Sequence, residues 1–125
     1  MKNISRLLTN ILSDKLKETK DFYISLFDFS AAYESDWYIQ LVSDKQQVEL
    51  GIIDQKSDLI PTAFQQPPKG FYLTFVVDSA DELFDLVQAK NYTIVSPPQD
   101  TFYGQRRFLI TDPNGVLVDV SSIIR

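Results

Sequence analysis

The chain has 125 residues, of which 44% are hydrophobic, and this length and composition fit one compact domain with a buried core. Its formal net charge of −5 argues against a nucleic-acid partner, because nucleic-acid affinity comes largely from clustered lysine and arginine. It contains no cysteine and no histidine, which excludes a disulfide framework, a thiolate nucleophile, sulfur-ligated zinc and the usual histidine triads.

No apolar run approaches the roughly 18 residues needed to cross a bilayer, so no membrane association is expected. The start of the chain, Met1-Lys2-Asn3, does not lead into the apolar core of a signal peptide. These features predict a cytoplasmic protein.

The first half of the chain predicts the element order β-α-β-β-β. Ile4 to Leu12 has the pattern of a strand, and residues 15–27 carry apolar side chains at near-helical spacing. Three further strands are predicted over residues 29–33, 37–43 and 47–53.

The second half repeats this order after a polar, proline-bearing connection over residues 54–69. A strand is predicted over residues 71–77, and Ser79 is expected to cap the helix that follows it. Glu82 stands three residues after Ser79, which completes a capping-box pattern. The remaining strands are predicted over residues 92–95, 106–111 and 117–122.

The last two predicted strands are joined by Asp112-Pro113-Asn114-Gly115, a hairpin turn by its residue types. Beyond the turn, every second residue is a valine, and these three side chains should share one face of the strand: Val116, Val118 and Val120. Asp119 lies between them in sequence and should point to the opposite face. A strand with core on one face and a carboxylate on the other indicates a lined cavity.

Several short motifs follow one another along the chain in a characteristic order. They are Thr19-Lys20-Asp21-Phe22-Tyr23, Leu26-Phe27-Asp28-Phe29, Ser35-Asp36-Trp37-Tyr38, Val48-Glu49-Leu50-Gly51, Phe75-Val76-Val77-Asp78 and the segment from Gly104 to Asp119. Their order and spacing resemble the vicinal oxygen chelate superfamily, which comprises glyoxalases, bleomycin-resistance proteins and extradiol dioxygenases.

The resemblance implies an α+β fold in which two βαβββ modules form a curved mixed sheet around a concave cavity, with the helices outside. Residues 1–125 would make a single domain, with module 1 over about 1–54, a linker over about 55–69 and module 2 over about 70–125. The family also implies a homodimer.

Metal ligands in this family are histidines and carboxylates on the first and fourth strands of each module. By the resemblance, Leu8 or Leu7 stands at the first histidine position and Tyr72 at the second. By the same resemblance, Glu49 lies in or beside the first-module acid position, and Asp119 matches the second-module acid position. Because both imidazoles are replaced, we expect neither a metal nor another cofactor.

The alternation of the strands places Tyr72, Glu49 and Asp119 on the cavity side. Asn10 joins them if the first strand is counted from the helix, although this register is uncertain by one residue. The predicted ligand-binding set is Asn10, Trp37, Glu49, Tyr72, Tyr103 and Asp119.

Five of the six members also have a plainer structural explanation. Glu49 and Asp119 are equally compatible with solvated strand positions. Tyr72 fits ordinary packing, Trp37 fits a core or dimer contact, and Tyr103 fits a surface loop.

Two classes of function follow from the resemblance. The first is a metal-independent small-molecule binding protein that sequesters its ligand. Because the chain is acidic, a cationic or amphipathic ligand would suit it. The alternative is a metal-dependent lyase, isomerase or dioxygenase, against which the loss of both histidines counts. An interaction module without either activity is a third possibility, and the sequence leaves open whether the protein is an enzyme.

Overall fold

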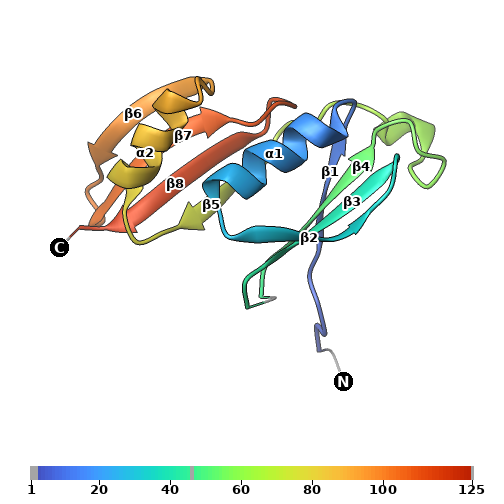
Figure 1. Ribbon diagram of the computed structural model, residues 1–125, viewed down its shortest axis with the longest axis horizontal. Coiled ribbons are helices and arrows are strands. Elements are labelled where there is room, and N and C mark those ends of the chain that lie inside the picture. The colour runs from blue at the N-terminus through green and yellow to red at the C-terminus, as the bar shows by residue number, and fades with distance from the viewer. Residues whose placement is uncertain (1–2, 46, 125) are drawn as a thin grey trace. The chain divides into compact units, whose positions relative to one another are not determined.

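A computed structural model describes residues 3–45 and 47–124 (Figure 1). The chain divides into two compact units, one up to Pro68 and one from Lys69 onwards. We call them module 1 and module 2. Within the described residues each holds one α-helix and four strands in the order β-α-β-β-β, which confirms the predicted α+β class and the repeated element order.

Module 1 forms a four-stranded mixed sheet in the order β1-β4-β3-β2. The pair β1 and β4 is parallel, whereas β4 with β3 and β3 with β2 are antiparallel. The elements are β1 (Thr9–Ser13), α1 (Leu16–Leu26), β2 (Phe29–Glu34), β3 (Tyr38–Ser43) and β4 (Glu49–Asp54).

The helix α1 covers one face of this sheet (Figure 1). The strands alternate accordingly: Ile11 of β1 and Ile52 of β4 are fully buried against the helix, whose Phe22 and Tyr23 are buried as well. Asn10 is one residue from Ile11 and Glu49 is three residues from Ile52, so both lie on the opposite face, which α1 does not cover. We call it the open face of module 1.

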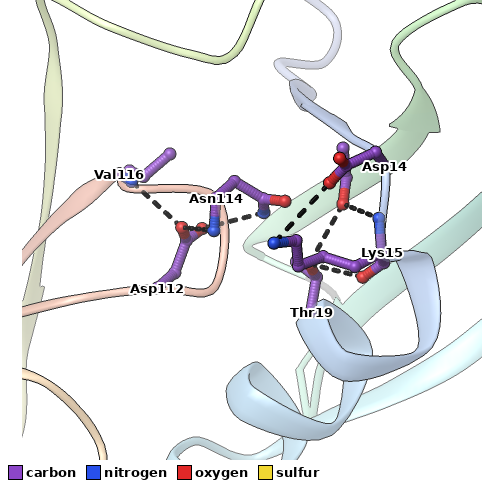
Figure 2. Close-up of polar contacts among 7 residues, drawn as sticks. Asp14, Lys15, Thr19, Asp112, Asn114 and Val116 are labelled. Carbon is purple, nitrogen blue, oxygen red and sulfur yellow. Dashed lines mark hydrogen bonds and ion pairs between the residues drawn. The ribbon is translucent and has the colours of Figure 1, made fainter.

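The start of α1 is fixed by hydroxyl groups rather than by a cap from Lys15. The Ser13 hydroxyl accepts a hydrogen bond of 2.9 Å from the Lys15 backbone N–H and lies 3.2 Å from the Thr19 hydroxyl. Thr19 in turn donates to the Lys15 carbonyl, and the Lys15 ammonium lies 3.8 Å from Asp14, as Figure 2 shows. Buried serine and threonine therefore fix the turn from β1 into α1.

Module 2 repeats the arrangement in the strand order β5-β8-β7-β6, again with its parallel pair, β5 and β8, at one edge. A short 3₁₀ helix, η1 (Thr62–Phe64), precedes it in the chain. The elements of module 2 are β5 (Tyr72–Val76), α2 (Ala80–Ala89), β6 (Ile94–Asp100), β7 (Gln105–Thr111) and β8 (Leu117–Ile123).

The core of module 2 lies between α2 and one face of its sheet. Val116, Val118 and Val120 are all buried, as the alternation predicts, and the ring of Phe108 meets Phe84 of the helix edge to face at 5.2 Å between centroids. The Ser79 hydroxyl accepts from the Glu82 backbone N–H at 3.2 Å, so the predicted cap of α2 is confirmed. The face of this sheet opposite α2 is the open face of module 2.

The turn between β7 and β8 is the predicted hairpin. The Asp112 carboxylate accepts hydrogen bonds of 2.7 Å from the Asn114 N–H and 3.0 Å from the Val116 N–H (Figure 2). Gly115 has φ of 87°, a conformation that glycine adopts without a steric penalty. An aspartate-anchored turn thus sets the register of β8, and with it the direction of Asp119.

Two predicted strands differ at an end by three residues or more. β1 begins at Thr9 instead of Ile4, and the side chains of Ile4 and Leu7 are exposed. β6 covers Ile94–Asp100 instead of residues 92–95, with two register shifts against β7. Neither α1, α2 nor any other helix among the described residues is long and apolar enough to cross a membrane.

Candidate functional site

The open face of module 1 is built around Gly51, which pairs with Asn10 of β1 on one side and with Gln40 of β3 on the other. A methyl group on Gly51 would lie 2.1 Å from the Asn10 Oδ1 and 2.7 Å from the Tyr38 Oη. The absence of a side chain at Gly51 therefore lets the polar tips of Asn10 and Tyr38 converge over the strand.

Glu49 lies two residues before Gly51 and is held by three donors. Arg6 donates from Nε to Oε2 at 2.6 Å and from Nη2 to Oε1 at 2.5 Å, a two-pronged ion pair. Gln40 adds a third hydrogen bond of 2.9 Å from Nε2 to Oε1. The family's first acid position is thus paired with an arginine of the same module.

The pKa values of Glu49 and of the nearby Tyr38 are both shifted from their ordinary values. The hydrogen bond from Arg6 is the main cause of a lowered pKa of Glu49, which burial opposes. Burial raises the pKa of Tyr38 above its ordinary value, Arg6 opposes this rise, and Glu49 adds to it. Tyr38 is therefore a neutral hydroxyl next to a charged pair at neutral pH.

An aromatic cluster adjoins these polar groups. The Tyr38 ring lies 5.6 Å from the Trp37 ring and 6.3 Å from the Tyr33 ring, between centroids, and both contacts are tilted. Trp37 and Tyr33 are exposed, at 39% and 51% of their surface. Module 1 therefore presents ring surface to solvent beside hydrogen-bonding groups.

A hollow of about 460 Å³ lies next to the ion pair. Its size is within the usual range of small-molecule sites, about 300 to 1,000 Å³. Its lining comes from four segments of module 1: Ser5, Arg6, Ala32, Gln40, Val42 and Glu49.

The open face of module 2 has the second acid at its centre. Asp119 is only 5% exposed and accepts hydrogen bonds from Thr74 at 2.9 Å, Ser121 at 3.0 Å and Arg107 Nε at 3.1 Å. The bond to Asp119 is the main cause of a raised pKa of Arg107. The family's second acid position is thus also paired with an arginine of its own module.

Two exposed tyrosines lie near this second pair. Tyr103 and Tyr72 each add to the rise in the pKa of Arg107, which places both phenol groups within electrostatic reach of the guanidinium. Tyr72 pairs with Leu117 on the same face as Asp119, as the strand alternation predicts.

The structure thus places the six predicted site residues in two groups. Asn10, Glu49 and Trp37 belong to module 1, where the first two lie on the open face and Trp37 borders Tyr38. Tyr72, Tyr103 and Asp119 gather around Arg107 in module 2. Their role in ligand binding stays a prediction.

Sequence reasoning missed several neighbours of these residues. Tyr38 and Gln40 share the parity of Gly51 across β3, so the alternation of that strand carries a signal for them. Arg107 shares the parity of Asp119 in the same way. Arg6 precedes β1, where no periodicity points to Glu49.

The donor set does not fit the family's metal site. Within residues 3–45 and 47–124, no three His, Cys, Asp or Glu side chains gather as metal ligands would. Glu49 and Asp119 each direct carboxylate oxygens to a guanidinium. A metal would have to displace these arginines and would find no imidazole in the chain.

Comparison with solved structures shows the same fold in several proteins. A glyoxalase/bleomycin resistance protein/dioxygenase family enzyme from Burkholderia phytofirmans PsJN is 22% identical, with a TM-score of 0.80 over 94% of this chain and 97% of that one. A superfamily member from Sphaerobacter thermophilus is 16% identical, with a TM-score of 0.78 over 98% and 99%. Lactoylglutathione lyase from Agrobacterium tumefaciens is 18% identical, with a TM-score of 0.73 over 98% and 96%.

These identities are low, so the structural likeness carries the fold alone. In a comparison with curated proteins, none matches. Residues 6–120 match the sequence profile of the Glyoxalase/Bleomycin resistance protein/Dioxygenase superfamily. This match extends over both modules. The chain therefore belongs to the glyoxalase/bleomycin resistance protein/dioxygenase superfamily.

Proposed function

We propose that this protein binds a small molecule on the open face of module 1 and does so without a metal ion. The observation that carries the proposal is the two-pronged ion pair between Arg6 and Glu49 at the family's first acid position. Asp119 repeats the pattern with Arg107 at the second. At both positions a guanidinium takes up carboxylate lone pairs that a metal would need.

Ligand binding on this face would rest on stacking and hydrogen bonding. Trp37, Tyr38 and Tyr33 supply ring surface, which favours an amphipathic ligand with a flat apolar part. The Asn10 amide and the Tyr38 hydroxyl converge over Gly51 on this face. These two groups would give a ligand hydrogen-bond partners, and the hollow beside Glu49 would give it room.

The proposal is tested by a thermal-shift screen of small aromatic and cationic molecules, in buffer with a chelator and in buffer with added divalent metal. A ligand that binds the native state raises the melting temperature by mass action. We expect hits whose shifts are the same in both buffers and are reduced in the Asn10→Ala variant. Tyr92→Phe, a substitution in module 2, is the matched control and should keep the shifts. Hits that need the metal would contradict the proposal and favour a metal-dependent enzyme.

We further propose that the protein acts as a homodimer, as the superfamily resemblance implies, and that it acts in the cytoplasm, as its sequence features lead us to expect. Fractionation of cells that express a tagged chain would test the compartment, and recovery of the chain with the membrane fraction would contradict it.

A further inference from the structure

We infer that Glu49 is a recognition site for an amidinium or guanidinium group on a ligand, and that Arg6 is a built-in competitor for that site. The inference rests on the proposed function and deepens it, because it names the charged group that the ligand carries. Glu49 holds a planar cation of this kind already, supplied by the chain itself.

The geometry of Glu49 suits a planar cation with two parallel N–H donors. Arg6 reaches both carboxylate oxygens, at 2.6 and 2.5 Å, in the arrangement that amidinium groups also adopt. Gln40 holds Oε1 from the neighbouring strand at 2.9 Å, so the carboxylate keeps its orientation if Arg6 leaves. A lysine-like ammonium, which is a point charge, would use this preset pair of acceptors less well.

Arg6 can leave at low cost. Its side chain is 57% exposed and comes from the segment before β1, whereas the Glu49 side chain is 13% exposed and lies within the sheet. Water would solvate the released guanidinium, which keeps its share of the cost of breaking the pair low. An incoming cation would regain the same two hydrogen bonds in place of Arg6.

The surroundings of Glu49 fit a cation attached to an aromatic body. Tyr38 lies two residues before Gln40, the strand neighbour that donates to Glu49, and the ion pair is within electrostatic reach of the Tyr38 hydroxyl. Tyr38 in turn contacts Trp37 and Tyr33. A ligand with its amidinium on Glu49 would therefore have ring surface beside it.

Module 2 provides a contrast within the same chain. Arg107 belongs to β7, its side chain is 28% exposed, and the Asp119 side chain is 7% exposed. Asp119 also accepts from Thr74 and Ser121, so its pair with Arg107 is part of a fixed network. The exchange is therefore specific to Glu49.

The test is calorimetric titration of benzamidine, an aromatic amidinium, into the wild type and three variants. Arg6→Gln should bind up to about fivefold more tightly, because removing an exposed ion pair opens the site in every molecule. Glu49→Gln should bind at least about tenfold more weakly, since a charge-assisted hydrogen-bond pair is lost. Arg106→Gln is the matched control, because it removes one positive charge from module 2, where Arg106 pairs with Asp81 and Asp100. It should bind as the wild type does.

Three results would overturn the inference. They are unchanged affinity in Arg6→Gln, no binding by Arg6→Gln at millimolar benzamidine, and equal tightening in Arg6→Gln and Arg106→Gln, which would indicate general electrostatics. Arg6→Lys, which keeps the charge without the fork, should lie between wild type and Arg6→Gln and guards against misfolding of one variant. Any of the three would leave the proposed function standing if neutral hits still depend on Asn10.

Discussion

Gly51 is the residue on which the open face of module 1 depends most. Its missing side chain is the space into which the Asn10 amide and the Tyr38 hydroxyl point. Both groups are the far ends of side chains, so a methyl group at Gly51 would displace them instead of moving the backbone.

We predict that Gly51→Ala lowers the free energy of unfolding by about 1 kcal/mol, through overpacking against these two tips. The double variant Asn10→Ala/Gly51→Ala should recover part of the loss, since the nearest contact, at 2.1 Å, is removed. Urea denaturation of the two single variants and the double variant measures this coupling. Additive losses would show that Asn10 does not lie over Gly51.

The lowered pKa of Glu49 predicts a pH dependence of stability, with Arg6 as its main cause. A carboxyl whose pKa is lower in the folded state stabilises the fold above its unfolded pKa, about 4.3 for glutamate, and this contribution is lost as the pH falls through the folded value. The difference in unfolding free energy between wild type and Glu49→Gln should therefore shrink on acidification below about pH 4.3. Arg6→Gln should remove most of that dependence. An unchanged difference down to the acid limit of the fold would contradict the ion pair.

At the residue scale, the sequence predicts on which face of a sheet a side chain lies better than it predicts which residue that side chain binds. Asn10 and Tyr72 lie on the faces that strand alternation assigns to them, with Asn10 in the register counted from the helix. The partners of the two acids could not be predicted, because Arg6 is 43 residues from Glu49 in sequence and stands outside any strand. For Arg107, the sequence shows only that it follows Arg106 in a predicted strand, where adjacent side chains point to opposite faces.

At the element scale, the hairpin between β7 and β8 controls the direction of Asp119. Asp112 is 4% exposed and accepts from two backbone N–H groups of the turn. We predict that Asp112→Ala costs about 1 to 3 kcal/mol of unfolding free energy, because these donors lose their acceptor. Chemical denaturation measures the loss.

Asn114→Ala is the control for this turn, because it keeps the backbone N–H that donates to Asp112, while the side-chain contact that it removes from Asp112 is a long one of 3.5 Å. It should cost much less than Asp112→Ala. Equal losses from the two substitutions would mean that the Asp112 acceptor is not what holds the turn.

Features with a local sequence signal could be predicted, whereas strand ends that are set by pairing could not. The Ser79 cap and the Asp112 turn depend on residues within a few positions of each other, and both are confirmed. The start of β1 is set by where β4 offers a partner, and that pairing begins at Thr9. β6 continues through Pro97 and Pro98 because it is an edge strand, where a missing N–H is tolerated.

At the scale of the whole chain, net charge is a poor guide to the charge of the site. The value of −5 favours a cationic ligand, yet the acids at both family positions are already paired with arginines. A ligand cation must therefore exchange with Arg6 instead of meeting a bare carboxylate. Net charge counts the charged residues of the solvated surface together with those of the site. The ion pairs in the structure show which carboxylates are already neutralised.

The superfamily resemblance predicts a homodimer. Analytical ultracentrifugation should give a mass of about twice the 14.4 kDa of one chain at micromolar concentration. A mass of one chain at every concentration would contradict this expectation and would leave the assignment of Glu49 intact.

The most direct test of metal-free binding on module 1 uses Trp37, the only tryptophan of the chain. It lies against Tyr38 and is partly exposed, so a ligand on this face should change its fluorescence. We predict that a hit from the thermal-shift screen shifts or quenches Trp37 emission with the same dissociation constant before and after dialysis against a chelator, and that Asn10→Ala weakens it. Binding that leaves Trp37 emission unchanged, or that disappears on dialysis and returns with a divalent metal, would contradict the account.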